Sequence, residues 1–304
     1  MNKQKVLVVI GPTGVGKSKM AVALAKQFNG EIISGDAYQV YKQLSIGSAK
    51  ITPNEMEGIP HYLVDCYDYT DDYNVKVFQD QARIYIDQIA KKGKLPIICG
   101  GTGLYIKAAL YDYVFEDEQV DQAYSKYLDT LDSQQLFEML VEVDPKSANV
   151  LHPNNARRVK RALLMHHAGT KKSERIDKQN HELLYDANII GLTLERAKLY
   201  ERIDKRVLKM MDTGLLDEIQ TIVKDRKTFD LQSMRGIGYK EWQPYMEGTA
   251  TAEQVISSIQ KNTRNFAKRQ YTWFNNQMQV HWFDISQPAI YEEITEQVSS
   301  FLKE

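Results

Sequence analysis

A glycine-rich loop, residues 11–18, constrains this chain more than any other feature. It reads GPTGVGKS and matches G-x-x-x-x-G-K-[ST]. The apolar run Lys5–Ile10 precedes it, and residues 19–29 are typical of a helix. In a strand–loop–helix context, glycines let backbone N–H groups converge on an anion, and the helix N-terminus adds its dipole. We therefore expect a diphosphate-binding loop at the end of a sheet strand.

Each residue of this loop has an expected place. Lys17 is predicted to reach the outer phosphate oxygens, and the Ser18 hydroxyl to hold Mg²⁺. The predicted diphosphate-binding residues are Gly11, Pro12, Thr13, Gly14, Val15, Gly16, Lys17 and Ser18. Most such loops bind ATP or GTP, so a nucleotide or small-molecule kinase with a helical lid stays open as the alternative function.

A kinase would normally offer a second acidic strand end for the magnesium ion. The apolar run Leu95–Cys99 ends without a carboxylate, and Asp65, after the short run from His61, could supply one. The weakness of this second signal counts against the kinase without excluding it.

Strand and helix signals alternate through the first third of the chain. The expected elements are a helix Lys19–Asn29 stopped by Gly30, a strand Glu31–Ser34, a helix capped by Asn74 and running to Lys92 before Gly93, and the strand Leu95–Cys99. Such alternation indicates a parallel sheet covered on both faces. The predicted fold class is α/β, a P-loop NTPase-like parallel sheet with flanking helices.

The pattern changes near Phe115, where strand signals nearly vanish and helical, charged stretches take over. We expect a core of residues 1–113, a mostly helical insertion of residues 114–189, and completion of the core by residues 190–304. Asn188–Leu194 is expected to return to the sheet. Two long helices, Leu194–Thr213 and Ala252–Asn275, are expected to follow.

Composition points to a cytoplasmic protein. No apolar run approaches the roughly 20 residues that span a membrane, and the two cysteines, Cys66 and Cys99, form no disulfide framework. No obligate protein partner is evident. The net charge of −1 hides an asymmetry, because residues 151–175 carry seven Lys or Arg against Glu174 alone. A segment this basic suits a phosphate-rich partner or a solvated face.

Beyond the glycine-rich loop, segments along nearly the whole chain resemble the tRNA dimethylallyltransferase (isopentenyltransferase) family. The matching segments are SGDAYQVY (34–41), IGSAK (46–50), IPHYLVD (59–65), GGTGLY (100–105), HPNNARRVKRAL (152–163), LYERIDKRV (199–207), GIGYKE (236–241) and TRNFAKRQYTWF (263–274). They occur in the family's order, so the resemblance is specific.

The resemblance implies a reaction and a set of roles. The exocyclic N6 amine of the adenine 3′-adjacent to the tRNA anticodon would attack C1 of dimethylallyl diphosphate and expel pyrophosphate. Asp36, just past a strand, could be a turn aspartate bonded to its own backbone, but the resemblance favours it as the general base. Lys17, Mg²⁺ at Ser18, Thr102 and Arg206 would meet the charge of the leaving group. Arg202, Arg206 and Lys209 form one helical stripe, from which the resemblance selects Arg206.

The tRNA anticodon stem-loop is the expected partner. Its predicted contacts are Asp36, Ala37, Tyr38, Gln39, Thr102, Arg157, Arg158, Val159, Lys160 and Arg161, with further charge from Lys171, Lys172 and Arg175. Gln39 could read the edge of the adenine, because glutamine pairs bidentately with that base. On the last long helix, Lys261, Arg264 and Lys268 form a second basic stripe. The aromatics among them, Phe266 and Trp273, are read chiefly as core.

Overall fold

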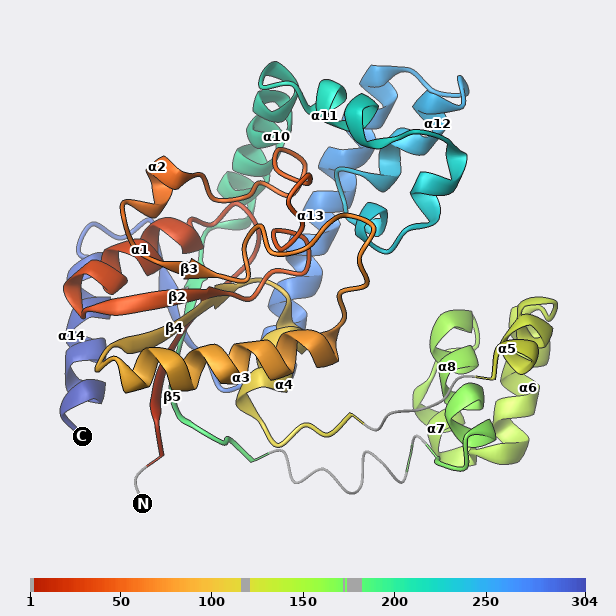
Figure 1. Ribbon diagram of the computed structural model, residues 1–304, viewed down its shortest axis with the longest axis horizontal. Helices are drawn as coiled ribbons and strands as arrows, with labels where there is room; N and C mark the ends of the chain where they lie inside the picture. Colours follow the sequence, from red (N-terminus) through yellow and green to blue (C-terminus); the bar gives the residue numbers. More distant parts are fainter. Residues whose placement is uncertain (1–2, 116–120, 172, 174–181) are drawn as a thin grey trace. The chain divides into compact units, whose positions relative to one another are not determined.

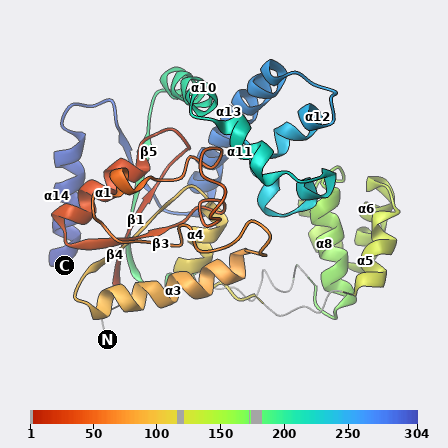
Figure 2. The same ribbon diagram turned by 45° about the horizontal axis from the view of Figure 1, so that its top comes forward.

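The computed structural model describes residues 3–115, 121–171, 173 and 182–304 (Figures 1 and 2). Its described strands form one parallel sheet in the order β3-β2-β4-β1-β5-β6. The strands are β1 (Lys5–Ile10), β2 (Gly30–Ser34), β3 (His61–Tyr62), β4 (Leu95–Gly100), β5 (Asp186–Thr193) and β6 (His281–Asp284). The predicted α/β fold with a parallel sheet is confirmed.

Alternation along β1 explains why the sheet has two buried faces. Val6, Val8 and Ile10 pack with α3 (Val75–Lys91) and α4 (Gly103–Leu110), whereas Leu7 and Val9 pack with α1 (Lys17–Gln27) and α14 (Ile290–Lys303). Figure 1 shows these helix pairs on opposite sides of the strands. A strand covered on both faces reads as a continuous apolar run, as β1 does.

The remaining helices follow the sheet elements along the chain. They are α2 (Pro53–Met56), α5 (Gln122–Asp129), α6 (Ser133–Val143), α7 (Pro145–Val150), α8 (Ala156–His167), α10 (Arg196–Asp212), α11 (Leu215–Ile222), α12 (Gln243–Met246) and α13 (Ala252–Gln277), with short 3₁₀ turns at Arg226–Asp230, Ser233–Arg235 and Lys240–Trp242.

The chain divides into two compact units. The larger joins Met1–Tyr111 to Leu183–Glu304, and the smaller, Asp112–Glu182, has its own apolar cluster around Leu140 and Val159. This unit ends before the expected boundary at residue 189, because Leu183 pairs with Tyr111 and Asp186 already begins β5.

Helix ends follow their local signals in most places. The Asn74 side chain accepts the N–H groups of Lys76 and Val77 at the start of α3, as predicted. Gly30 does not stop α1, however. The chain leaves that helix through Asn29, which adopts φ 49°, so Gly30 is already the first residue of β2. A side chain at Gly30 would collide with Ile97 of the neighbouring strand.

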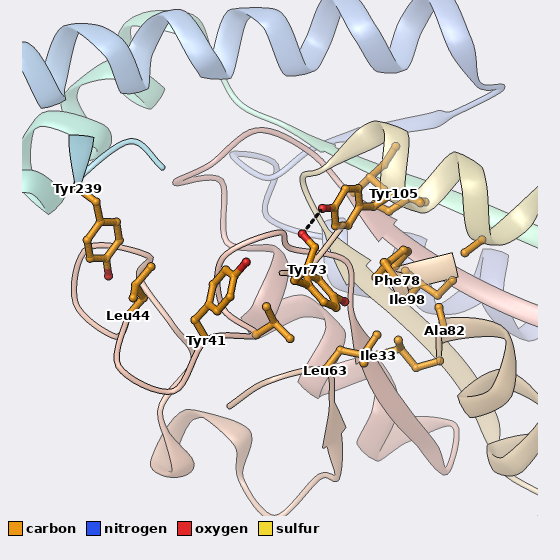
Figure 3. Packing of buried hydrophobic residues seen from close by; sticks show 14 of the residues in the cluster. Ile33, Tyr41, Leu44, Leu63, Tyr73, Phe78, Ala82, Ile98, Tyr105 and Tyr239 are labelled. Carbon is orange, nitrogen blue, oxygen red and sulfur yellow. Dashed lines mark hydrogen bonds between the residues drawn. The ribbon is translucent and has the colours of Figure 1, made fainter. Parts of the chain in front are cut away.

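A tyrosine-rich core lies beneath the loop that follows β2 (Figure 3). Tyr73 contacts the rings of Tyr41, Tyr67 and Tyr105 with centroid separations of 5.1–6.4 Å. The Tyr105 hydroxyl donates to the carbonyl oxygen of Tyr73 at 3.4 Å. Because Tyr41 in the loop after β2 is buried here, this segment is packed against α3 and α4.

Candidate active site

Three loops meet at one edge of the sheet because parallel strands end together. Ile10 of β1 pairs with Gly100 of β4, and Cys99 of β4 pairs with Ser34 of β2. The carboxyl ends of these strands therefore deliver the glycine-rich loop, the Asp36 loop and the Thr102 loop to the same edge. This is where α/β sheets usually bind ligands.

The glycine-rich loop has the backbone of an anion site. Gly14 and Gly16 adopt φ 83° and 99°, and Gly16 is the N-cap of α1. The Lys17 ammonium donates to the carbonyl oxygen of Pro12 at 2.9 Å. Burial lowers the pKa of Lys17 to about 8, although the negative charge of Asp36 acts in the opposite direction. A lysine held like this gains a full charge most easily when an anion arrives beside it.

Asp36 has the contacts of a turn aspartate, and its role as general base stays a prediction. Its Oδ1 accepts the N–H groups of Tyr38 at 2.8 Å and Gln39 at 3.2 Å, which is the geometry of a turn aspartate. The Oδ2 atom accepts no hydrogen bond among the described residues. The carboxylate lies close enough to Lys17 and Arg206 to raise the pKa of both. The turn therefore orients one oxygen and leaves the other available.

Arg206 reaches this edge from α10. One guanidinium nitrogen lies 3.5 Å from the Thr13 hydroxyl, and the other lies 3.4 Å from the carbonyl oxygen of Ala49. Burial lowers the pKa of Arg206, with Asp36 and Glu55 raising it. Arg202 and Lys209, on the same predicted stripe, are exposed. Of the three stripe residues, only Arg206 contacts the glycine-rich loop.

Thr102, on the third loop, is the N-cap of α4. Its N–H donates to the carbonyl oxygen of Gly35 at 3.2 Å, which ties it to the residue before Asp36. Its hydroxyl makes no hydrogen bond to a described residue. Half-buried Thr102 is therefore placed with a free hydroxyl at the edge shared with Lys17 and Asp36.

The other residues after Asp36 are half-buried in the same loop. The Gln39 amide donates to the carbonyl oxygen of Ala49 at 3.2 Å, the same oxygen that Arg206 approaches. Tyr38 packs against Gly236, where an added Cβ would lie 2.9 Å from its ring. The role of Ala37, Tyr38 and Gln39 toward a base stays a prediction.

Sequence reasoning missed the residues that hold these loops together. Glu218 accepts the N–H groups of Ser45, Ile46 and Gly47, and Gln270 bonds both Thr13 and Gly101. Both side chains come from distant helices. Gln270 and Tyr239, which bonds Glu218, lie in the quoted segments TRNFAKRQYTWF and GIGYKE, and that was the signal that could have found them.

The predicted magnesium site rests on Ser18. Its side chain is exposed in the first turn of α1, where a hydroxyl can meet a metal bound to phosphate oxygens. Among the described residues there is no cluster of three His, Cys, Asp or Glu side chains that could hold a metal. Asp65, the alternative ligand, forms an ion pair with Lys50 instead.

The basic segment of α8 divides by burial. Arg157, Arg158 and Arg161 are exposed, whereas Lys160 is bonded to Asp129 at 2.5 Å. Val159 is fully buried in the core of the helical unit, so we correct the predicted tRNA contact of its side chain to a structural role. Lys171 is half-buried, and Lys172 and Arg175 lie outside the described residues.

The second basic stripe, on α13, is also only partly available. Lys261 and Lys268 are exposed, but Arg264 pairs with Asp204 of α10. Trp273 fills the space above Gly103, where a Cβ would lie 2.1 Å from its ring.

No helix in the described part of the chain is both long and apolar enough to cross a membrane.

Comparisons with known proteins agree with this arrangement. A family model described as IPP transferase matches residues 39–277, and one described as isopentenyl transferase matches residues 4–68. The tRNA dimethylallyltransferase of Bacillus cytotoxicus is 50% identical over 289 residues, which cover 93% of this chain and 91% of that protein.

Solved structures are similar over the same length. The tRNA isopentenylpyrophosphate transferase of Bacillus halodurans gives a TM-score of 0.76 at 40% identity, covering 99% of this chain and 97% of that one. A eukaryotic dimethylallyltransferase acting on tRNA gives a TM-score of 0.85 at 29% identity, covering 99% of this chain and 80% of that one. The likeness therefore spans both the sheet and the C-terminal helices.

Proposed function

The chain belongs to the IPP transferase family, and we propose that the edge formed by Lys17, Asp36, Thr102 and Arg206 is its active site. The protein is a tRNA dimethylallyltransferase. It transfers a dimethylallyl group from dimethylallyl diphosphate to the N6 amine of the adenine 3′-adjacent to the anticodon, and pyrophosphate leaves. The kinase alternative has no support in the comparisons.

The chemistry sets two demands that these residues can meet. N6 forms a bond to C1 of the donor while the C1–O bond breaks, and the electron pair of that bond leaves with pyrophosphate. An aromatic amine is a weak nucleophile, so a base must take its proton as the bond forms. Asp36 is that base, because its Oδ2 is unbonded while the turn to Tyr38 and Gln39 orients the carboxylate.

The developing pyrophosphate needs positive charge and N–H donors. The pyrophosphate would be met from the start of α1 by the loop amides up to Ser18 and the Lys17 ammonium. It would be met from α10 by the Arg206 guanidinium. Fixed charges aimed at a leaving group stabilise the transition state more than the ground state. Thr102 supplies a hydroxyl from the opposite loop.

A magnesium ion would fit beside the diphosphate. Mg²⁺ prefers oxygen ligands and is usually held by substrate phosphates, waters and few protein groups. The exposed hydroxyl of Ser18 is the protein oxygen that would hold it. When bound, the ion would neutralise charge on the leaving pyrophosphate.

Arg157, Arg158 and Arg161 are assigned to tRNA phosphates, and the Asp36–Gln39 segment to the adenine. The adenine must leave the base stack before its N6 amine can reach C1 of the donor, so the acceptor is a loop base flipped out of the stack. The convergence of Asp36 with the diphosphate loop is the observation that carries the assignment of the active site.

The test is product formation without any nucleoside triphosphate. Unmodified tRNA, Mg²⁺ and dimethylallyl diphosphate are incubated with the protein, and the tRNA is digested and analysed by mass spectrometry. We expect N6-dimethylallyladenosine together with an equal amount of pyrophosphate. Absence of both, with phosphoryl transfer from ATP to a small acceptor that yields ADP, would overturn the proposal.

A further inference from the structure

The side chain of Gln270 joins two loops of the active-site edge. Gln270 lies on α13 and is 5% exposed. Its Oε1 accepts the N–H of Thr13 at 2.9 Å, and its Nε2 donates to the carbonyl oxygen of Gly101 at 2.9 Å. Because one partner is a donor and the other an acceptor, only one orientation of the amide satisfies both.

These two contacts belong to different loops of the proposed active site. Thr13 belongs to the diphosphate loop, and its hydroxyl lies 3.5 Å from Arg206. Gly101 directly precedes Thr102. The two loops follow neighbouring strands, since Ile10 of β1 pairs with Gly100 of β4. Gln270 connects Thr13 of one loop with Gly101 of the other through its side-chain amide.

The backbone is shaped around this side chain. A Cβ at Gly101 would lie 2.3 Å from Nε2 of Gln270, so residue 101 must lack a side chain for the bridge to form. The contact continues along the same face of α13, where Trp273 packs on Gly103 and Gln277 accepts from Lys107 at 2.8 Å. The spacing 270, 273 and 277 is that of one helix face.

We propose that Gln270 is a positioning residue for prenyl transfer, which sets the diphosphate loop against the Thr102 loop. This inference rests on the proposed function, because its assay measures prenyl transfer to tRNA. Gln270 engages the Thr13 amide, so it does not itself hold the diphosphate. Lys17 and the amides that follow Thr13 remain to bind the donor. Gln270 therefore acts on where Thr102 lies relative to the bound diphosphate, and its loss affects the rate more than binding.

The test compares Gln270→Met with Gln277→Met. Methionine has a similar volume and removes the hydrogen bonds, and Gln277 offers the same residue type on the same helix face two turns from the bridge. The measurements are the single-turnover rate at saturating tRNA and dimethylallyl diphosphate, the Kd of pyrophosphate by calorimetry, and the thermal unfolding midpoint of each variant.

We expect Gln270→Met to lower the single-turnover rate by about 10- to 100-fold, because small misplacements of reacting groups have effects of that size. The Kd of pyrophosphate should change by less than about threefold, and Gln277→Met should stay within about threefold of the parent in rate. An equal fall for Gln277→Met, or a loss of affinity as large as the loss of rate, would overturn the proposal.

Gln270→Asn keeps the amide but is one methylene shorter, so it cannot span both partners. It serves as the second variant if Gln270→Met does not fold, and a parental rate for Gln270→Asn would also contradict the proposal. If the parent protein forms no prenylated tRNA, it is the proposed function that fails, and the inference about Gln270 falls with it.

Discussion

The Tyr239 hydroxyl donates a hydrogen bond of 2.8 Å to the carboxylate of Glu218 and accepts the N–H of Ser48 at 3.0 Å. Glu218 also accepts three successive backbone N–H groups, from Ser45 to Gly47. Burial and Glu218 raise the pKa of Tyr239 well above its ordinary value, so the phenol keeps its proton at neutral pH. Tyr239 and Glu218 thus hold residues 45–48 in place by hydrogen bonds, a contact that we call the clasp. The next residue, Ala49, has the carbonyl oxygen that Arg206 approaches.

We expect Tyr239→Phe to lower stability by about 1–3 kcal/mol, because it removes a buried hydroxyl and leaves both the half-buried Ser48 N–H and the Glu218 carboxylate short of a hydrogen bond. Turnover should fall as well, since Ala49 and Arg206 lose a fixed support. Urea unfolding and steady-state kinetics measure the two effects. Tyr245→Phe is the matched control, because that hydroxyl makes no hydrogen bond to a described residue. Equal stability of the two variants would contradict the clasp.

Asp36→Asn should reduce turnover by at least about 10²-fold and leave tRNA affinity nearly unchanged, because a missing base affects the transition state. The fold should survive, since the asparagine oxygen can still accept the N–H groups of Tyr38 and Gln39. Asp65→Asn is the control within the neighbouring segment and should stay close to the parent, because Asp65 pairs with Lys50. Turnover of Asp36→Asn within a few-fold of the parent would remove Asp36 from the base role.

Local signals made the diphosphate loop, the Asn74 cap and the Leu95 strand predictable from sequence. Each depends on residues within a few positions of one another. β3 and β6, with two and four residues, are too short to show a period and form because neighbouring strands pair with them. The stop of α1 was misplaced by one residue because Asn29 also tolerates the left-handed conformation.

Long-range contacts were beyond the reach of sequence patterns. Gln270 forms hydrogen bonds with Thr13, which is 257 positions away in the sequence, and with Gly101, which is 169 positions away. No local sequence spacing predicts either contact. Arg206 was distinguished from Arg202 and Lys209 only by the family resemblance, because one helical stripe presents all three. Their burial separates them in the structure. Val159 was included with its charged neighbours, although helical spacing turns it inward.

Arg157 and Arg158 should position tRNA phosphates without reading sequence. Replacing both with Gln should weaken binding of every tRNA similarly and flatten the slope of log K against log salt, by up to about 0.9 per lost contact on the duplex scale. Lys160→Gln should change the slope less, because Lys160 pairs with Asp129. Filter binding across a salt series measures the slopes. An unchanged slope for the double variant would mean that this part of α8 does not contact tRNA phosphates.

Diphosphate binding should depend on pH through Lys17. In the free enzyme burial lowers the pKa of this ammonium to about 8, so it is charged below pH 8 and loses its proton above it. A bound diphosphate favours the charged form and raises the pKa. Lys17 should therefore take up a proton on binding above pH 8, which adds a fall in pyrophosphate affinity of up to about tenfold per pH unit there to the effect of the ligand's own titration.

Calorimetry in two buffers of different ionisation enthalpy measures this proton uptake directly. Lys17→Arg is the matched variant, because a guanidinium stays charged across the same range. Its affinity, whatever its absolute value, should lack the fall contributed by Lys17 between about pH 8 and pH 9.5. A parallel fall in the parent and in Lys17→Arg would assign the pH dependence to another group. A flat parent profile would mean that Lys17 is already fully charged before the diphosphate binds.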